Sequence, residues 1–378
     1  MIDHTLADAP PINPADVVAL PEGARMYPLP LPAPGQGPTA LVHAYAAVRN
    51  RSSWETSGRG DDQFTAEELL PLLDSSADMV RRQWCIEQDG ALIGCAVLNI
   101  RQDGGADVAQ WYLALLRDVW GRGIGSAAYA EIERVARADG VRELQLWAEH
   151  ADVHADGARL ESPSGFGSVP QDHATRFLAR HGHTIEMIDR VSMLTWDDAT
   201  IPHLRGLLAD AAAHAEGYRV VHWTLPTPPE RRDGYAWMKS RMSTDAPSGD
   251  LASPEEAWDA ERVVRHDERY AARGQSVLVT AAEHVGTGEL CAFNELAIGI
   301  DRTATTHQEE TLVLSSHRGH RLGMLVKCAG LLAWRDIHPR SPSVVTYNAE
   351  ENRPMLSINE AIGFTAIAAE SAWKKVLT

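Results

Sequence analysis

Segments with helical periodicity and segments with strand periodicity alternate along the chain. In the first half, apolar residues recur every three or four positions in four segments, which predicts helices at 39–49, 65–82, 126–139 and 172–180. Alternating or short apolar runs predict strands at 83–88, 91–100, 109–116, 141–149 and 185–196. The dipeptide Asp89-Gly90 between the first two strands predicts a tight hairpin turn.

The same order of elements begins again in the second half. The predicted helices are 202–214, 323–336 and 354–361, and the predicted strands are 218–223, 276–283, 289–301, 306–314, 343–349 and 365–374. Residues 225–275 are predicted to form a polar and mostly helical insert. A repeat of half the chain indicates duplication. We therefore expect an α/β protein with a proline-rich leader at 1–38, a first domain at 39–198 and a second at 199–378.

Composition and charge are those of a globular protein with an acidic surface. Hydrophobic residues make up 44% of the chain and charged residues 23%, so each half can bury a core. The net charge of −17 argues against a nucleic-acid partner, and it would attract a cationic substrate. The alternative is that the acidity only keeps the protein soluble.

The cysteines and histidines give no sign of a metal site. Cys85, Cys95, Cys291 and Cys328 form no CxxC pair, and the 16 histidines include no HExxH pattern. We expect free core cysteines, a reducing compartment and no metal. The N-terminus lacks the basic and apolar parts of a signal peptide, and no apolar run approaches a membrane span. These absences predict a cytoplasmic protein without membrane contact.

The strongest chemical signal is the glycine-rich turn after the strand at 109–116. It contains Gly121, Gly123 and Gly125 and leads directly into a helix. Backbone N–H groups at a helix N-terminus lack partners, and glycine lets the backbone approach a phosphate, so the turn is typical of an anion cradle. A plain connection or a dinucleotide site is the alternative, but the spacing is not GxGxxG and no Walker lysine follows.

This turn resembles the coenzyme-A-binding motif of the GNAT N-acetyltransferase superfamily, whose pattern is Arg/Gln-x-x-Gly-x-Gly/Ala. Gly123 and Gly125 match the two small positions, and Trp120 stands at the Arg/Gln position. In the second half, Arg318 matches the first position and Gly323 matches the last. The first small residue of the pattern is replaced there by Arg321.

A second segment carries the same resemblance. Residues 352–364 resemble the family's N…A…lYeklGF segment, and residues 177–183 in the first half match the same segment less closely. The resemblance implies two tandem GNAT-like domains, each a mixed and mostly antiparallel sheet flanked by helices, with acetyl-CoA bound where two parallel strands part. The layout is similar to that of mycothiol synthase, a tandem family member whose C-terminal domain is the active one.

The resemblance also implies cofactor-binding residues, because the family holds coenzyme A with the strand before the turn and with the turn itself. In the second domain these residues are Leu312, Val313, Leu314, Arg318, Gly319, His320, Arg321, Leu322, Gly323, Met324 and Asn352. In the first domain they are Leu115, Leu116, Gly121, Arg122, Gly123, Ile124, Gly125 and Ser126. By the same resemblance, Asn352 would hydrogen-bond the pantetheine or phosphate arm.

Acyl transfer to an amine needs a base, which the family often supplies as a carboxylate on the strand before the turn. Glu310 is the first candidate and Glu309 the second. Strand alternation puts His307 with Glu309 on one face and Glu310 on the other. The first domain offers only Asp107 near its strand start, and Ala109 stands where the base is common. We therefore expect the catalytic centre in the second domain.

A general acid is harder to find. The family commonly uses the tyrosine of lYeklGF, but Asn359 stands at that position in the second domain and Leu178 in the first. Tyr347, at a strand end beside the expected cleft, is a substitute, with water as the alternative. No Ser/His/Asp or Cys/His set has recognisable spacing, so no covalent intermediate is expected. Three tryptophans are expected in the insert's own core rather than in a substrate pocket: Trp223, Trp237 and Trp258.

These features predict an N-acetyltransferase that moves an acetyl group from acetyl-CoA to an amine of a small polar, cationic metabolite or antibiotic. The protein is expected to be a monomer or homodimer. Three alternatives stay open: another acyl donor on the same fold, a non-catalytic acyl-CoA-binding regulator or scaffold, and acetylation of proteins. The missing tyrosine at 359 and the altered glycine at 321 favour the non-catalytic alternative slightly.

Overall fold

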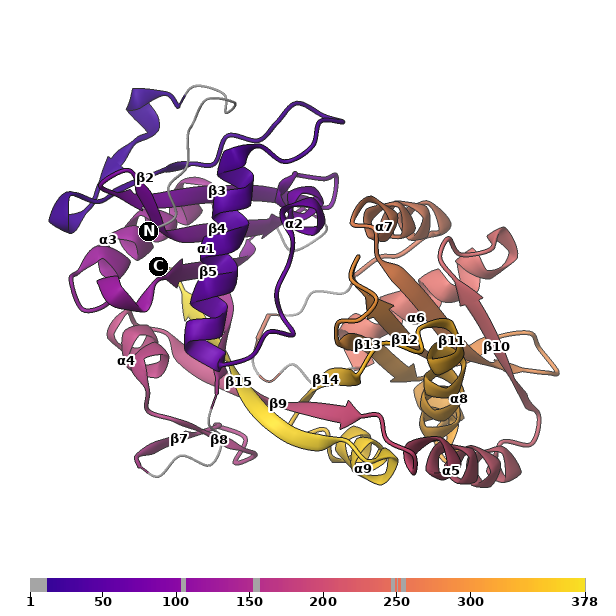
Figure 1. Ribbon diagram of the computed structural model, residues 1–378. Coiled ribbons are helices and arrows are strands. Elements are labelled where there is room, and N and C mark those ends of the chain that lie inside the picture. Colours follow the sequence, from indigo (N-terminus) through magenta and orange to yellow (C-terminus); the bar gives the residue numbers. More distant parts are fainter. Residues whose placement is uncertain are drawn as a thin grey trace. The chain divides into compact units, whose positions relative to one another are not determined.

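The computed structural model describes residues 12–102, 107–151, 157–245, 249, 251–252 and 256–377. The start of the predicted leader and parts of the predicted insert at 225–275 lie outside the described residues. The chain forms two compact units (Figure 1). Unit 1 comprises Met1–Ala158, Pro170–Glu186 and Ser371–Thr378, and unit 2 comprises Arg159–Val169 and Met187–Glu370.

Unit 1 is built on a mostly antiparallel set of strands. The strands are β1 (Val18–Ala19), β2 (Arg25–Pro28), β3 (Met79–Gln88), β4 (Ala91–Arg101), β5 (Val108–Leu115) and β6 (Glu143–His150). The helices are α1 (Ala40–Ser57), α2 (Ala66–Leu73), α3 (Ile124–Ala138) and α4 (His173–Arg180). Neighbouring strands from β1 to β5 are antiparallel, whereas β5 and β6 are parallel. The leader therefore supplies the edge of the sheet with β1 and β2.

Unit 2 repeats this plan. Its strands are β10 (Tyr218–Thr224), β11 (Ser276–His284), β12 (Leu290–Ile298), β13 (Thr306–Val313) and β14 (Ser343–Ala349). Its helices are α5 (Thr200–His214), α6 (Arg232–Asp245), α7 (Ala260–Ala272), α8 (Leu322–Ile337) and α9 (Arg353–Ile362). Strands β10 to β13 are antiparallel, and β13 and β14 are parallel. The short strands β7 (Arg159–Glu161) and β8 (Ser168–Pro170) form a separate two-stranded sheet.

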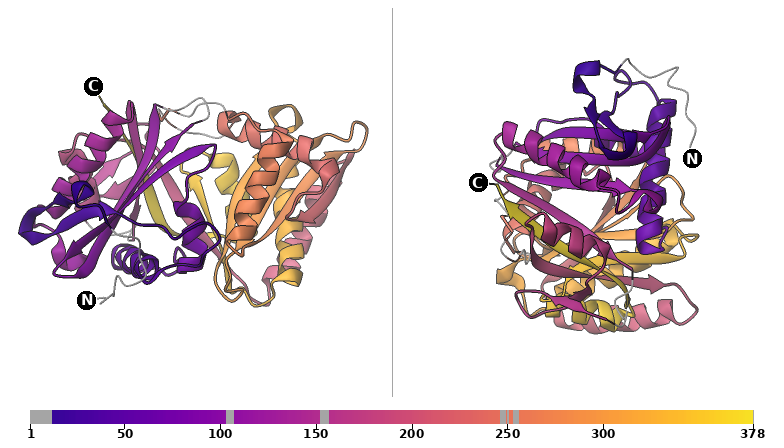
Figure 2. Two further views of the ribbon diagram at one scale, coloured as in Figure 1. Left: turned by 90° about the horizontal axis from the view of Figure 1, so that it is seen from above. Right: turned by 90° about the vertical axis from the view of Figure 1, so that its left-hand side faces the viewer.

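The helices at 225–275 are the counterparts of α1 and α2 and not an insert. Helix α1 packs on β4 and β5, as α6 packs on β12 and β13, and α2 contacts β3, as α7 contacts β11. Helix α8 packs on β11, β12 and β13, and Figure 2 shows helices on both faces of the unit 2 strands. The duplication predicted from the sequence is thereby confirmed, and it extends to a segment that showed no similarity.

Strands β9 (Thr184–Thr195) and β15 (Thr365–Val376) each have one part in unit 1 and the other part in unit 2. Strand β9 begins in unit 1 and continues in unit 2, where it pairs antiparallel with β14. Strand β15 begins in unit 2 and ends in unit 1, beside β6. The strand that follows α4 therefore completes unit 2, and the last strand of the chain completes unit 1. Sequence order does not predict this exchange, because strands close in sequence usually pair.

Local sequence explains most element boundaries. Asp89 and Gly90 have φ of 51° and 79°, as a two-residue hairpin turn requires, and the predicted hairpin is confirmed. The helix predicted at 65–82 is wrong in its second half, because β3 begins at Met79 and pairs with β4 along its whole length. The hydrogen bonds and burial of the sheet outweigh the helical periodicity there.

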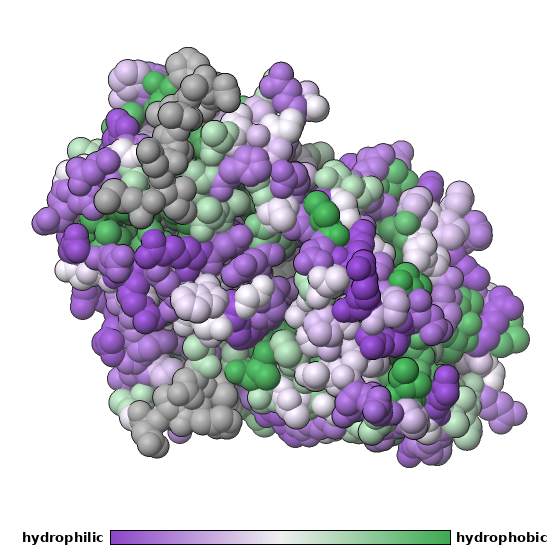
Figure 3. Space-filling model, in the orientation of Figure 1, coloured by the Kyte–Doolittle hydropathy of each residue, from purple (hydrophilic) through white to green (hydrophobic). Residues whose placement is uncertain are grey.

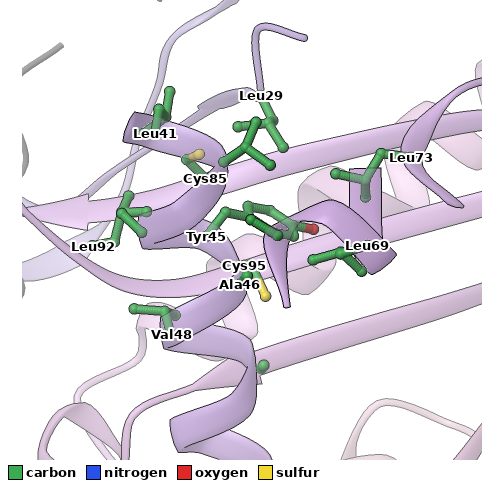
Figure 4. Close-up of a cluster of buried hydrophobic side chains, with 14 of the residues drawn as sticks. Leu29, Leu41, Tyr45, Ala46, Val48, Leu69, Leu73, Cys85, Leu92 and Cys95 are labelled. Atoms are coloured by element: carbon green, nitrogen blue, oxygen red, sulfur yellow. The ribbon is translucent and has the colours of Figure 1, made fainter. Parts of the chain in front are cut away.

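Apolar side chains fill the space between helices and strands in each unit. Figure 4 shows such a cluster in unit 1, where Tyr45 of α1 and Leu69 of α2 pack over Cys85 and Cys95 of the sheet. All four cysteines of the chain are free and buried. This agrees with the expected core role and gives no disulfide framework.

The tryptophans of unit 2 divide between core and surface. Trp223 is buried beside Tyr235, and Trp258 packs against the same cluster, as expected. The expectation is wrong for Trp237, which is 51% exposed. Hydrophilic residues predominate on the face shown in Figure 3. Among the described residues, no helix combines the length and the apolar character needed to cross a membrane.

Candidate active site

The parallel strand pair of each unit opens after a short paired stretch. Strand β5 pairs with β6 only at 108–110, and β13 pairs with β14 only at 306–308. Beyond these stretches, no strand among the described residues pairs with the edge of β13 that faces β14. Such an edge leaves backbone N–H and C=O groups available to an extended polar ligand. This is the parting of parallel strands that the sequence resemblance implies.

The turn after each opening has the same backbone conformation in both units. Gly121 and Gly123 have φ of 76° and 84° in unit 1, and Gly319 and Arg321 have φ of 91° and 53° in unit 2. Arg321 therefore adopts the left-handed conformation that glycine takes in unit 1. Its departure from the motif leaves the shape of the turn unchanged, at the steric cost of a Cβ in that region.

Both turns end in a helix that no side chain caps. The N-cap residues are Gly123 for α3 and Arg321 for α8, and neither helix start has a side-chain cap hydrogen bond. Gly323 lies close against α9, since a Cβ there would come within 3.0 Å of Ile358. Uncapped N–H groups beside a close backbone turn fit the phosphates of a nucleotide-type ligand.

The side chains of the other predicted cofactor residues are mostly buried or already bonded. The buried ones are Leu115, Leu116, Ile124, Leu312, Leu314 and Leu322. Val313 and Met324 pack against a buried cluster. Ser126 bonds to His181 at 3.0 Å, and Arg321 forms an ion pair with Asp210 of α5. Backbone groups are therefore the main binding groups that these positions offer.

The two openings differ at the first position of the motif. In unit 1, the indole Nε1 of Trp120 donates to the carbonyl of Leu115 at 2.8 Å, and the ring stacks on His173 with centroids 4.1 Å apart. In unit 2, the exposed Arg318 stands at this position. Within the described part of the chain, no side chain donates to the carbonyl of Val313, the counterpart of Leu115. Among the described residues, a side chain of the turn therefore occupies this backbone carbonyl in unit 1 and not in unit 2.

Strand β13 carries a bulge that β5 lacks. Its register against β12 shifts between Asn294 and Leu296, so that Glu309 and Glu310 together stand opposite Glu295. The register of β5 against β4 is continuous. A bulge leaves the extra residue outside the ladder and re-aims its side chain. The predicted alternation, with the two glutamates on opposite faces, is therefore wrong.

Glu310 is held by a buried lysine of α6. The Nζ of Lys239 lies 2.8 Å from Oε2 of Glu310 and 3.3 Å from Oε1 of Glu295, and the Tyr235 hydroxyl donates to the same Glu295 oxygen. Burial raises the pKa of Glu295. Burial opposes the charge on Lys239, but the two carboxylates outweigh it and raise the pKa of that amine. The Glu310 side chain keeps 36% exposure and is the accessible end of this cluster.

Glu309 lies on the same side of the sheet as Glu310. Burial, and next the charge of Glu309, raise the pKa of Tyr270 on α7. In unit 1, the residue at the corresponding place is Trp111, which packs against Tyr129 of α3 on the other face. The bulge therefore brings two carboxylates to the α6/α7 side of the second opening.

Comparisons with known proteins agree with this geometry. Residues 47–159 match the model of the acetyltransferase (GNAT) family. A solved tandem GNAT protein from the clavulanic acid biosynthesis pathway is 24% identical, and the alignment covers 93% of this chain and 98% of that one with a TM-score of 0.70. The chain has the fold of a tandem GNAT protein. No curated protein sequence matches it.

Two other solved structures share the GNAT fold at lower identity. A GCN5-related N-acetyltransferase from Sphaerobacter thermophilus is 14% identical over 94% of this chain and 96% of that chain, with a TM-score of 0.60. A glucosamine N-acetyltransferase region of a fungal multi-domain β-N-acetylglucosaminidase is 12% identical over 88% of this chain and 37% of that chain, with a TM-score of 0.57. Both support the fold, and neither identifies an acceptor for this chain.

The C-terminal GNAT segment forms α9 and the start of β15. Asn352 is the N-cap of α9, and its Oδ1 accepts the Met355 N–H at 3.4 Å. Its contact with the cofactor stays a prediction. Tyr347 packs against a cluster of Val191, Val345 and Ala368, which makes it part of a core, and its role as a general acid is also untested.

Three groups that can bind metals gather near the second GNAT turn. Potential ligand atoms of Glu289, Cys291 and His317 all lie within 4.8 Å of one another. Two of these groups already have partners within the chain. The Cys291 thiol donates to the carbonyl of Glu289 at 3.4 Å, and the Tyr218 hydroxyl shares a hydrogen bond with Nδ1 of His317 at 2.8 Å. The positions of these side chains therefore do not require an ion. We therefore keep the expectation of no metal as a prediction.

The structure also assembles a Ser-His-Asp set that sequence spacing did not indicate. His150 lies 2.7 Å from Asp172 through Nδ1 and 2.7 Å from Ser371 through Nε2. Ser371 is fully buried, and its hydroxyl oxygen also accepts the Trp373 indole N–H at 2.7 Å. A nucleophile needs access to a substrate, so we interpret this set as a structural contact that fixes β15 in unit 1.

Unit 1 has a buried acid of its own on the α1/α2 side. Glu149 of β6 pairs with Arg59 at 2.8 Å, and burial raises the pKa of Glu149 to about 7. The folded state therefore binds a proton that the unfolded chain has lost between pH 4.5 and 7. The free energy of unfolding must fall as the pH rises through this range.

We expect the stability of unit 1 to decrease by on the order of 2 kcal/mol between pH 5 and pH 8 through this group. Urea unfolding of Glu149→Gln at pH 5, 6, 7 and 8 should show a flatter pH dependence than the wild type. Glu67→Gln, at an exposed position of α2, is the control and should keep the wild-type slope. A Glu149→Gln profile that matches the wild type would contradict the prediction.

Proposed function

We propose that unit 2 transfers an acetyl group from acetyl-CoA to an amine of a small, polar, cationic molecule. The observation that carries this proposal is the bulge of β13, which puts Glu309 and Glu310 together beside the opening. Unit 1 has an opening and a similar turn, but its β5 is regular and bears no carboxylate at the corresponding place. We therefore assign the reaction to unit 2.

Each part of the proposed site has a separate task. Bound acetyl-CoA would supply an activated acetyl thioester. The N–H groups at the start of α8, together with Arg318, would bind its phosphates, and the unpaired edge of β13 would hold the pantetheine. Glu310 would accept the proton that the amine loses, while Lys239 holds this carboxylate in place.

Charge defines the proposed class of acceptor. The chain carries a net charge of −17, and Glu309 and Glu310 add negative charge at the opening. A cationic amine such as a polyamine or an amino sugar would be attracted to this site, whereas a nucleic acid would be repelled. As part of the proposal, the protein acts in the reducing cytoplasm, away from membranes, as a monomer or homodimer, in keeping with its four free cysteines.

Calorimetric titration with acetyl-CoA tests the cofactor assignment. We expect Arg318→Ala to weaken binding about tenfold, because one charge-assisted contact to phosphate contributes about 1.4 kcal/mol. Arg122→Ala, in the turn of unit 1, is the matched control and should leave binding at unit 2 unchanged. The proposal fails if acetyl-CoA does not bind at millimolar concentration.

Release of coenzyme A thiol with a panel of amines tests the reaction itself. We expect turnover with cationic amines and weaker turnover with neutral or acidic ones. Propionyl-CoA and longer donors in the same assay would show whether acetyl is the preferred acyl group. Binding of acetyl-CoA without thiol release for any amine would favour the acyl-CoA-binding scaffold instead.

A further inference from the structure

A fully buried lysine in α8 stands among apolar neighbours. Lys327 is 0% exposed, and no carboxylate within the described residues forms an ion pair with it. Its Nζ donates to Oδ1 of Asn359 at 2.9 Å, and burial lowers the pKa of this amine to about 7. An apolar side chain of similar length would fill the same space without the cost of a buried amine. Packing alone therefore does not explain a lysine here.

Lys327 sets the direction of a chain of hydrogen bonds. The Nζ of Lys327 donates to Oδ1 of Asn359, and Asn359 in turn donates its Nδ2–H to Oδ1 of Asn348 at 2.6 Å. The side-chain NH₂ group of Asn348 can then donate a hydrogen bond to another acceptor. Lys327 on α8 therefore fixes the orientation of the Asn359 amide on α9, and Asn359 in turn fixes the orientation of the Asn348 amide on β14.

Asn348 lies where the opening of unit 2 begins. The last residue of β14 that pairs with β13 is Thr346, and Asn348 follows two positions later on the same face. Asn359 of α9 contacts this face, whereas Glu310 contacts α6 on the other face. The opening therefore has a carboxylate on one side and a directed amide donor on the other.

We propose that Lys327, acting through Asn359, directs the Asn348 side-chain N–H to the carbonyl oxygen of a thioester bound in the opening of unit 2. This inference rests on the proposed function. Negative charge develops on that oxygen as the amine attacks, and a donor that is already oriented stabilises it. Asn348 is the residue that touches the thioester, and Lys327 is a positioning residue.

Infrared spectroscopy of acetyl-CoA labelled with carbon-13 at the thioester carbonyl reports this hydrogen bond directly. We expect the carbonyl band of the bound ligand at lower wavenumber in the wild type than in Lys327→Met or Asn348→Ala. Turnover should fall about 10- to 100-fold in both variants. Lys375→Met, which removes a lysine of unit 1, is the matched control and should keep the wild-type band and rate.

The outcomes separate this inference from the proposed function. The same carbonyl band in the bound wild type and both variants would overturn the role of Lys327 and leave acetyl transfer standing. Failure of acetyl-CoA to bind the wild type would overturn both. Lys327→Met is expected to fold at least as stably as the wild type, because an apolar group replaces a buried amine. Should it not fold, Asn348→Ala carries the same spectroscopic test.

Discussion

Replacing Glu310 with glutamine should lower kcat/KM for acetyl transfer by about 10²- to 10⁴-fold, because an amide cannot accept the proton of the attacking amine. Glutamine keeps an oxygen that can accept from Lys239, so the α6 contact and the fold should survive. Binding of acetyl-CoA should be unchanged, since the turn before α8 does not include this residue. Steady-state kinetics at pH 7 and calorimetry of acetyl-CoA measure the two expectations.

Glu309→Gln is the matched control for this prediction. The residue is adjacent, has the same chemistry and lies on the same side of the sheet, but no ion pair to Lys239 fixes it. We expect at most a few-fold loss. A larger loss in Glu309→Gln than in Glu310→Gln would move the base to Glu309, and losses below threefold in both would exclude a carboxylate base on β13.

The fold follows closely from sequence because its signals are local. Strand and helix periodicity, the Asp89-Gly90 turn and the repeated glycine turn each depend on neighbouring residues. Apart from the second half of the helix predicted at 65–82, the structure places these elements close to their predicted positions. Arg321 shows the limit of a motif, since it takes the backbone conformation of the glycine it replaces. A pattern of residue types therefore underestimates how well the second turn is preserved.

The site could be predicted only in part because its contacts join distant segments. Glu309 and Glu310 were chosen from strand and motif, but the bulge that turns both to one side depends on pairing with β12. Lys239 reaches Glu295 from a segment that showed no resemblance. Glu295 and Lys327 did leave a signal, as charged residues inside the apolar runs 290–298 and 322–334. A charge in such a run is expected to have a specific partner.

The exchange of β9 and β15 had no signal in the sequence. Each strand has the alternating pattern of its predicted position, and nothing in that pattern says which sheet it joins. The sheet that each strand joins depends on tertiary contacts, such as the one between Ser371 and His150 in unit 1. Periodicity predicts that a strand forms, whereas its partner depends on the packing of the whole unit.

Replacing Lys239 with methionine should destabilise unit 2 by about 3–5 kcal/mol, because it leaves Glu295 buried without its opposite charge. The pKa of Glu295 is already raised by burial, and loss of the amine raises it further. The folded variant must then keep Glu295 protonated, while the unfolded chain releases the proton above its ordinary pKa. The stability of Lys239→Met should therefore fall more steeply than that of the wild type as the pH rises from 5 to 8.

Urea unfolding at several pH values tests this, with a double variant as the decisive comparison. Lys239→Met combined with Glu295→Gln removes the buried charge, and the glutamine oxygen can still accept from the Tyr235 hydroxyl. We expect this double variant to recover most of the lost stability and to lose the added pH dependence. If the double variant is as unstable as Lys239→Met, the loss comes from packing of α6 and not from an uncompensated charge. Lys239 and Glu295 would then keep Glu310 in place through packing and not through their charges.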